Sequence, residues 1–150
     1  MTLPHNILVP IDLDDSAAQV LDYAIALAAK LDAKLHVLHA VPWPLLGAEL
    51  PIAVTDTAMD EIMKRKQKAF DELLAAHPPK QPLGSAAVKT GDARTAILAA
   101  ANELRVDLIV MGTHGRRGVS RLVLGSVAES VARTAPSPVL LVRSGLAIAP

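Results

Sequence analysis

The feature that most constrains the fold is a regular alternation of short apolar segments with longer amphipathic segments along the chain. The apolar segments are rich in valine, isoleucine and leucine, and they are Asn6 to Ile11, Lys34 to Ala40, Ser85 to Thr90, Asp107 to Met111 and Pro138 to Val142. Several are nearly continuous, which is typical of strands that are covered on both faces, as in a parallel sheet. We therefore predict five strands.

Each gap between these strands contains a segment with the period of an amphipathic helix. The four segments are Ser16 to Leu31, Thr57 to Ala76, Asp92 to Leu104 and Ser126 to Thr134. In the first of them, Val20, Ala24, Leu27 and Leu31 fall on one face. Alternation of strands and helices implies right-handed βαβ units. We therefore expect a doubly wound α/β fold, with an open five-stranded parallel sheet and helices on both faces.

The length of the chain suggests one domain, and its balanced charge suggests no strong overall electrostatic field. The chain has 150 residues, of which 51% are hydrophobic, so we expect a single domain over residues 1–150. Fifteen lysine and arginine residues balance fifteen aspartate and glutamate residues. This balance provides no general attraction to nucleic acid or to an anionic membrane. Any anion must be bound by local geometry.

The start of the chain and its apolar segments do not resemble export or membrane signals. Residues Met1 to Asn6 lack the basic and apolar regions of a signal peptide. The longest apolar runs are well short of the about 20 residues that a membrane-spanning helix requires. The chain has no cysteine, which excludes disulfides and thiolate chemistry and is compatible with a reducing compartment. We expect a cytoplasmic protein.

Glycines gather where the fourth predicted strand ends and where the last predicted helix begins. The strand leads into Gly112-Thr-His-Gly115-Arg-Arg-Gly118, and Gly125-Ser126-Val127 opens the helix. Glycine allows positive φ and a close approach of the backbone, so such a segment can direct its amide groups at one anion. A helix N-terminus adds unpaired N–H groups and the positive end of its dipole. The segment predicts a site for a ligand that carries phosphates.

The spacing of these glycines resembles the ATP-binding signature of the universal stress protein family. It reads glycine, two residues, glycine, nine residues, then glycine and serine. Asn6 to Asp12, reading NILVPID, resembles the first strand of that family with its acidic end, and Pro136 to Val142, reading PSPVLLV, resembles its last strand. The resemblance covers essentially the whole chain. It implies a Rossmann-like fold with strand order 3-2-1-4-5, in which Asp12 and Gly112 converge.

The resemblance also implies which residues hold the ligand. Pro10, Ile11 and Asp12 would lie beside the adenosine, and the backbone of Val41 would meet adenine. From the fourth strand onward, the implied contacts are Met111, Gly112, Gly115, Arg116, Gly125, Ser126 and Val127. The last three would supply amides and one hydroxyl to the terminal phosphates. The implied ligand is ATP, with ADP and AMP as alternatives, bound together with Mg²⁺, and no protein side chain is assigned to a metal.

Some of these residues also have structural interpretations. Ser126 and Glu129 have the spacing of a capping box, and Asp14 and Asp15 stand where acidic residues commonly stabilise a helix start. After the third strand the family commonly has glycine, any residue, proline, whereas this chain has Gly91-Asp92-Ala93. The rigid turn is lost, but Asp92 is a good N-cap.

Two further features concern the neighbouring segments and partners. Val41 to Val54 contains three prolines and a glycine, which predicts a long loop over the carboxyl end of the second strand. Val139 to Val142 is an apolar strand with few charges to prevent pairing with another chain, and we expect a homodimer through it. His36 and His39 are three residues apart on a predicted strand and therefore point to opposite faces, which argues against a shared metal.

Other classes of function fit the sequence less well. A Walker-type NTPase requires Gly-Lys-Ser/Thr, which the chain lacks. An ATP pyrophosphatase would carry a serine- and glycine-rich loop where Pro10 to Asp14 stands, and a response-regulator receiver would carry an aspartate where Lys89-Thr90-Gly91 stands. We expect an ATP-binding stress-response or regulatory protein. Slow ATP hydrolysis and a nucleotide-independent dimeric interaction module stay open as alternatives.

Overall fold

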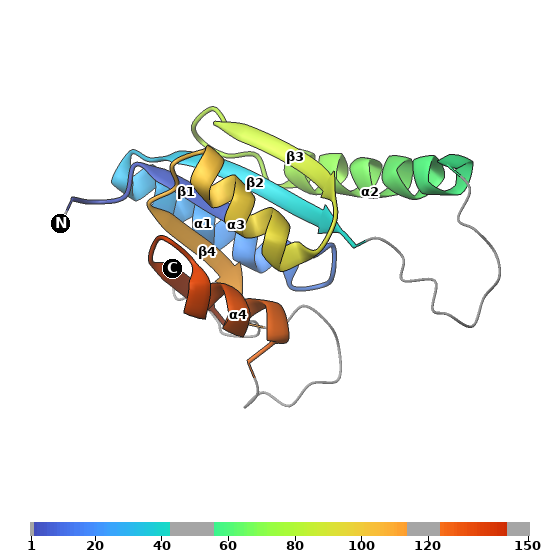
Figure 1. Cartoon of the computed structure of the whole chain (residues 1–150). Helices are drawn as coiled ribbons and strands as arrows, with labels where there is room; N and C mark the ends of the chain where they lie inside the picture. The colour runs from blue at the N-terminus through green and yellow to red at the C-terminus, as the bar shows by residue number, and fades with distance from the viewer. Residues whose placement is uncertain (1, 43–55, 114–123, 144–150) are drawn as a thin grey trace.

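Strands and helices alternate along the chain as predicted (Figure 1). The computed structural model describes residues 2–42, 56–113 and 124–143. The elements are β1 Asn6–Pro10, α1 Ala17–Leu31, β2 Lys34–Val41, α2 Asp56–Ala76, β3 Ser85–Thr90, α3 Ala93–Glu103, β4 Leu108–Gly112, α4 Ser126–Thr134 and β5 Val139–Val142. Every predicted element is present, with ends within one residue of the predicted ends. Val41 closes β2 instead of opening the predicted long loop, most of which lies outside the described residues.

The five strands form one parallel sheet in the order β3-β2-β1-β4-β5. β1 is central, since Ile7 pairs with Leu35 of β2 on one side and with Leu108 of β4 on the other. The chain first proceeds outward from β1 to β3, then returns to the other side of β1 for β4 and β5. The direction therefore switches between β1 and β4. In open α/β sheets, ligands bind beyond the carboxyl ends of the strands at such a switch point.

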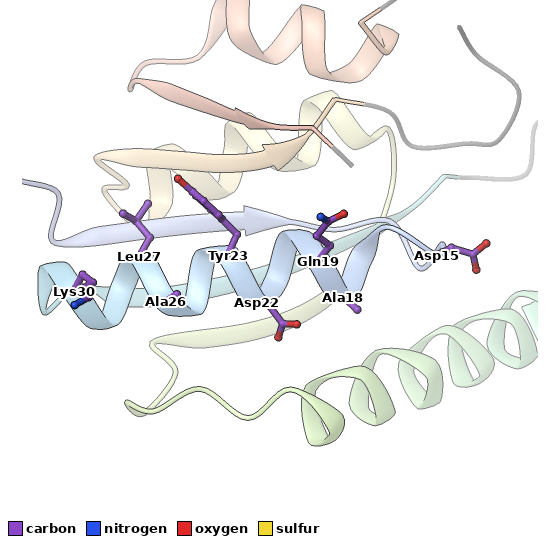
Figure 2. A pocket seen from close by; sticks show the side chains of 8 residues that line it. All are labelled: Asp15, Ala18, Gln19, Asp22, Tyr23, Ala26, Leu27 and Lys30. Carbon is purple, nitrogen blue, oxygen red and sulfur yellow. The ribbon is translucent and has the colours of Figure 1, made fainter. Parts of the chain in front are cut away.

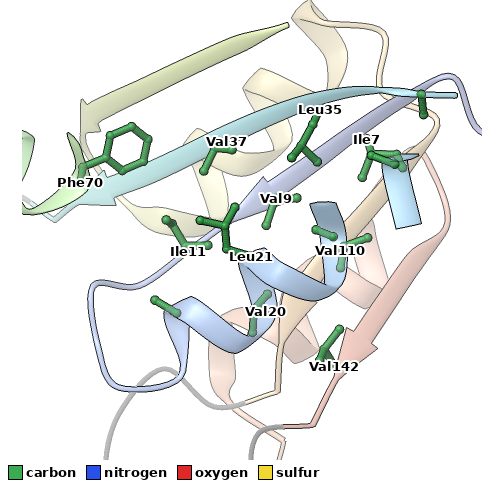
Figure 3. Close-up of a cluster of buried hydrophobic side chains, with 14 residues drawn as sticks. Ile7, Val9, Ile11, Val20, Leu21, Leu35, Val37, Phe70, Val110 and Val142 are labelled. Atoms are coloured by element: carbon green, nitrogen blue, oxygen red, sulfur yellow. The ribbon is translucent and has the colours of Figure 1, made fainter. Parts of the chain in front are cut away.

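One face of the sheet is covered by α1 and α2, whose apolar side chains meet every second residue of the strands. Figure 3 shows this core, in which Leu21 of α1 and Phe70 of α2 face Val9 and Val37 of the central strands. Leu21, Val9 and Phe70 are at most 1% exposed. The continuous apolar sequence of the strands is explained by burial on this face and on the opposite one.

The opposite face is covered by α3 and α4, which makes the sheet doubly wound. Ile97 of α3 and Val131 of α4 pack against Leu8 and Ile109 of the strands. Figure 1 shows α3 and α1 on opposite sides of β1. Among the described residues, no helix is long and apolar enough to cross a bilayer.

An acidic side chain ties β1 to β4 at the edge of the sheet where these strands begin. Asp107, predicted as the first residue of the fourth strand, accepts hydrogen bonds from the amides of His5 (3.0 Å) and Asn6 (2.9 Å). Its own amide donates to the carbonyl of Asn6 at 3.0 Å. The carboxylate thus takes amides that would otherwise need another partner. β4 itself begins one residue after Asp107, at Leu108.

Candidate functional site

A cavity of about 470 Å³ opens at the carboxyl edge of the sheet, at the switch point between β1 and β4. Its walls come from the ends of β1, β2 and β4 and from the first turns of α1, α3 and α4. The helices of βαβ units run antiparallel to the strands, so their N-termini gather at this edge. The positive ends of three helix dipoles therefore border the cavity. Its volume lies within the ~300–1,000 Å³ of typical small-molecule sites.

Most of the predicted site residues meet in this cavity. The lining includes Pro10, Ile11, Asp12, Met111, Gly112, Gly125, Ser126 and Val127. Val41 is buried between two lining residues, Ala40 and Pro42, and its carbonyl accepts a 2.8 Å hydrogen bond from the amide of Gly91. Its contact with a base stays a prediction. Gly115 and Arg116, predicted around the phosphates, lie outside the described residues.

The two ends of the glycine segment are held together by backbone hydrogen bonds. The amide of Gly125 donates to the carbonyl of Thr113 at 2.7 Å, and the amide of Thr113 donates to the carbonyl of Val142 at 3.1 Å. These bonds fix the start of α4 directly beside the end of β4. The first and last glycines of the predicted signature, Gly112 and Gly125, therefore line the same cavity although thirteen positions separate them in the chain.

The start of α4 differs from the capping box predicted for it. The N-cap is Gly125, and Ser126 is the first helical residue, without a side-chain capping hydrogen bond. The interpretation of Ser126 and Glu129 as a capping box is therefore wrong, because the helix begins at Ser126, one residue earlier than a box with Ser126 as N-cap requires. Glycine has no side-chain oxygen, so the amides of the first turn, from Ser126 to Ala128, have neither an intrahelical partner nor a capping side chain.

The other two helices that border the cavity begin differently. At α3, the carboxylate of Asp92 accepts hydrogen bonds from the amide and hydroxyl of Thr95, both at 2.9 Å. Before α1, the carboxylate of Asp14 accepts from the amide (2.9 Å) and hydroxyl (2.7 Å) of Ser16. Asp92 caps α3 as expected, whereas the N-cap of α1 is Ser16, whose side chain makes no capping hydrogen bond, and Asp14 binds Ser16 itself. An external anion therefore finds the start of α3 occupied by a carboxylate, whereas the first-turn amides of α4 have no capping side chain.

The cavity wall away from α4 is largely apolar. Ile11 follows β1, and Leu38, Ala40 and Pro42 come from the end of β2. Pro10 has no amide hydrogen and Pro42 none either, which leaves fewer backbone donors on this side. A flat apolar group can be buried here without leaving many polar atoms unpaired. The cavity is therefore apolar at the β1 and β2 ends and rich in amide donors at α4.

Two carboxylates belong to the cavity, and their surroundings differ. Asp12 is exposed and follows the last paired residue of β1 by two positions. Asp92 is exposed at the cavity rim, and the hydrogen bond from the Thr95 amide, assisted by the Thr95 hydroxyl, lowers the pKa of Asp92 below its ordinary value. Among the described lining residues there is no lysine, arginine or histidine. Negative ligand charge in this part of the site must therefore be balanced by amides, helix dipoles or a cation brought with the ligand.

Several lining residues were not identified from the sequence. Thr113 is 8% exposed and joins the two ends of the glycine segment, and Ala128 supplies the third amide of the first turn of α4. Ser16 and Ile97 complete the walls from α1 and α3. The position of Ala128 follows from a helix that begins at Ser126, so the glycine at the N-cap was the signal. The contributions of α1 and α3 depend on packing between distant segments, which no local pattern reports.

A larger hollow of about 740 Å³ lies along the outside of α1 and has a different character. Figure 2 shows its lining, which runs from Asp15, two positions before α1, along that helix to Lys30. Tyr23 and Leu27 point toward β4 and β5, and Asp22 points away from them. The lining of this hollow includes no strand end and comes from the side chains of one helix and Asp15. We therefore assign the ligand site to the smaller cavity, where strand ends and helix N-termini meet.

The fold is that of a Rossmann-like α/β protein, with a cavity at its topological switch point that is bordered by helix N-termini. Residues 4–143 match the profile of the universal stress protein family, and the chain belongs to this family. It is 33% identical over 139 residues to universal stress protein A homolog 1 of Coxiella burnetii, which covers 91% of this chain and 94% of the relative. It is 30% identical over 146 residues to universal stress protein YxiE of Bacillus subtilis, covering 93% and 99%.

Solved structures show the same architecture. A universal stress protein family structure from Burkholderia pseudomallei is 28% identical, with a TM-score of 0.67 and coverage of 91% of this chain and 94% of that chain. A universal stress protein in complex with cAMP is 25% identical, with a TM-score of 0.65 and coverage of 95% and 98%. The second structure shows that a protein of this fold binds an adenine nucleotide.

Proposed function

We propose that this protein is a regulatory member of the universal stress protein family that binds ATP, together with Mg²⁺, in the cavity at the switch point. The base and ribose would lie against Pro10, Ile11 and Asp12, and the phosphates would reach the start of α4. Gly125, Ser126 and Val127 would bind the terminal phosphates through amides and the Ser126 hydroxyl. Gly112 would lie against the ribose and the inner phosphates, with Gly115 and Arg116 completing the phosphate contacts.

The observation that carries this proposal is the contrast between the starts of α3 and α4, which both border the cavity. Asp92 caps α3 through the amide of Thr95, whereas α4 begins at a glycine and has no capping side chain. Phosphate oxygens are strong acceptors, and an uncapped helix N-terminus provides amides and a positive dipole for them. The same orientation places the base against the apolar β1 and β2 ends. Both halves of the cavity thus match the two halves of a nucleotide.

The character of the site favours binding over efficient hydrolysis. Phosphoryl transfer depends on positioned cations and on a group that orients the attacking nucleophile. The described lining offers Asp12 and Asp92 but no cationic side chain, and Asp92 is already engaged by Thr95. We therefore propose that ATP acts as a signal that changes conformation or partner choice. A nucleotide-bound relative of the same fold supports this class of ligand.

Calorimetric titration with ATP, ADP, AMP, cAMP and GTP, with and without Mg²⁺, tests the proposal. We expect ATP to bind, with adenine nucleotides preferred over GTP, and Mg²⁺ to strengthen binding because the acidic side chains of the site otherwise repel the triphosphate. Phosphate release measured over hours in the same samples would report any hydrolysis. Failure of every nucleotide to bind would overturn the proposal and favour the nucleotide-independent interaction module.

Two substitutions assign the cavity. Asp12→Ala should weaken ATP binding about tenfold, as expected for loss of one hydrogen bond to a charged group. Asp15→Ala is the matched control, because Asp15 is an exposed carboxylate three positions away that lines the α1 hollow and not the cavity. Gly125→Ala should also weaken binding. Its φ of −59° and ψ of 149° are open to alanine, so the fold should tolerate this change. Equal affinities in Asp12→Ala and Asp15→Ala would remove Asp12 from the site.

We also propose that the protein forms a homodimer through β5. This strand lies at the edge of the sheet, and its residues Val139 to Leu141 are half-buried within the single chain. An edge with apolar side chains and unpaired backbone groups can pair with a second copy. Light scattering coupled to size-exclusion chromatography should show twice the 15.8 kDa mass of the chain. Leu140→Lys should shift the protein toward the monomer, and a wild-type monomer at micromolar concentration would overturn this proposal.

A further inference from the structure

His39 of β2 is buried deep behind the wall of the candidate site. It is 5% exposed, and its Nδ1 lies 2.8 Å from the carbonyl oxygen of Ile11. A carbonyl oxygen can only accept, so Nδ1 carries a proton and donates this hydrogen bond. Within the described part of the chain, Nε2 is buried without a hydrogen-bond partner. A buried polar atom left unpaired is costly, and an apolar residue at this position would avoid the cost. The contact through Nδ1 therefore calls for a function.

The contact holds the chain at the point where β1 leaves the sheet. The pairing of β1 with β2 ends at Pro10 and Leu38, and Pro10 has no amide hydrogen to give to a ladder. Beyond it, the amide of Ile11 donates to the carbonyl of Leu38 at 2.8 Å, and the imidazole of His39 donates to the carbonyl of Ile11. Both backbone polar groups of Ile11 are thus bound to β2, one by backbone and one by a side chain.

The residues held in this way are the ones that line the cavity. Pro10, Ile11 and Asp12 all belong to its wall, and Asp12 directly follows the anchored carbonyl. Leu38 and Ala40 also line the cavity, whereas His39 does not. Alternate residues of a strand point to opposite faces, so His39 lies on the face covered by α1 and α2. It can reach the ligand only through the backbone of Ile11 and Asp12.

We propose that His39 is a positioning residue for the nucleotide site, which fixes the Ile11–Asp12 peptide so that Asp12 meets the ligand without rearrangement. This inference rests on the proposed nucleotide-binding function and adds to it a residue that touches no ligand. The hydrogen bond from Nδ1 orders this part of the wall before binding. A wall that is already ordered loses less conformational freedom when the ligand binds.

The test separates the hydrogen bond from the bulk of the side chain. In His39→Asn the amide nitrogen occupies nearly the position of Nδ1 and can still donate to Ile11, whereas His39→Leu fills similar space without a donor. We expect His39→Leu to bind ATP about tenfold more weakly, as for loss of one hydrogen-bonded contact, and His39→Asn to stay close to wild type. If His39→Leu does not fold, His39→Gln replaces it as the variant without the hydrogen bond. The longer glutamine side chain carries its amide nitrogen beyond the position of Nδ1, so it no longer meets the carbonyl of Ile11.

His36 provides the matched control on the same strand. It is also buried, at 6% exposure, and it contacts Ser85 and Asn6 near the opposite edge of the sheet. His36→Leu should therefore change stability without changing ATP affinity in the folded protein. A purely structural role for His39 would give the same result for both histidines. Equal ATP affinities for wild type and His39→Leu would overturn the proposal.

A measurement without nucleotide distinguishes failure of this inference from failure of the proposed function. In the nucleotide-free protein, hydrogen–deuterium exchange at the Ile11 amide, which donates to the carbonyl of Leu38, should become faster in His39→Leu and stay at the wild-type rate in His39→Asn. Unchanged exchange in His39→Leu would overturn the positioning role whatever the ATP titrations show. If exchange becomes faster in His39→Leu but the wild type binds no nucleotide, His39 still orders the wall. The proposed function, and the link between His39 and nucleotide binding, would then be overturned.

Discussion

Among single residues, Gly84 and His36 form a tight contact at the edge where the strands begin. A Cβ built at Gly84 would overlap the His36 ring, with its three nearest atoms all in that imidazole. The ring is held by contacts of 2.8 Å from Nδ1 to the Ser85 hydroxyl and 3.4 Å from Nε2 to Asn6 Oδ1. It therefore joins β1, β2 and the start of β3 and has little room to move. Only glycine fits opposite it.

Replacing Gly84 with alanine should consequently lower the free energy of unfolding by about 1–3 kcal/mol, the usual cost of overpacking. Urea denaturation followed by circular dichroism measures the change. The same substitution in a His36→Ala background should cost less, because the ring that the new methyl group meets is gone. If alanine at position 84 were equally costly with and without the imidazole, the close contact would not be its cause.

The buried imidazole of His36 should also make stability depend on pH. Desolvation, with a smaller contribution from Lys34, lowers the pKa of His36 below its ordinary 6.5. The unfolded chain therefore binds a proton at a higher pH than the folded chain does. The stabilisation from neutral His36 is complete above pH 6.5 and is lost as the pH falls through that value toward the folded-state pKa. Unfolding free energies of wild type and His36→Gln between pH 5 and 8 should diverge in this way, and parallel curves would contradict it.

Among the elements, the helix starts at the cavity differ in whether a side chain caps their first amides. α3 and the turn before α1 carry their own carboxylates, whereas α4 begins at Gly125. The family resemblance assigned Gly125 to the phosphate contacts, whereas the pattern of residues alone suggested a capping box with Ser126 as N-cap. In the structure the N-cap is Gly125, and the helix begins one residue earlier than that box requires. That single position decides whether the first amides of α4 meet a side chain or remain available for a ligand.

The cap of α3 gives a prediction at this scale. Asp92→Ala should destabilise the protein because the Thr95 amide loses its acceptor, and Asp92→Asn should retain part of the effect because asparagine is also a good N-cap. The lowered pKa of Asp92 means that the wild-type advantage over Asp92→Asn is present above pH 3.8 and disappears as the pH falls through the folded-state pKa. Thermal melts of the three proteins at pH 7 and at pH 3 test both statements. Equal melting temperatures at pH 7 would contradict the capping role.

Considering the whole molecule, two apolar cores separated by the sheet hold the strand ends at one edge. Leu21 of α1 is fully buried in the first core and Ile109 of β4 in the second. Each core packs against several strands at once and therefore fixes the positions of those strands relative to one another. The relative placement of the β1 and β4 ends, and hence of Asp12 and Gly112, depends on both.

Leu21→Ala should therefore lower the free energy of unfolding by about 2–5 kcal/mol, through lost burial and the cavity left behind. Leu3→Ala is the control, since Leu3 is 67% exposed and its truncation should cost less than about 0.5 kcal/mol. Urea denaturation of both variants measures the difference. Comparable losses in the two variants would mean that the assigned core does not carry the stability of the fold.

What could be predicted from the sequence was local in origin. Apolar runs and the helical period report which segments become strands and helices, since burial on two faces or on one stripe leaves its mark on neighbouring residues. This is why every element was found within one residue. The glycine segment and the acidic end of β1 indicated a phosphate ligand and most of the cavity wall, with help from the family resemblance. The strand order came from that resemblance alone.

Tertiary structure decided which distant segments meet. Ser16, Ile97 and Thr113 reach the cavity only because βαβ crossovers bring three helix starts to one edge of the sheet, and the role of His39 depends on a carbonyl 28 positions earlier. Hydrogen bonds and cavities between remote residues depend on packing, and no local pattern records it. The chain's local pattern thus determined the helices and strands, whereas packing between remote segments determined the geometry of the cavity.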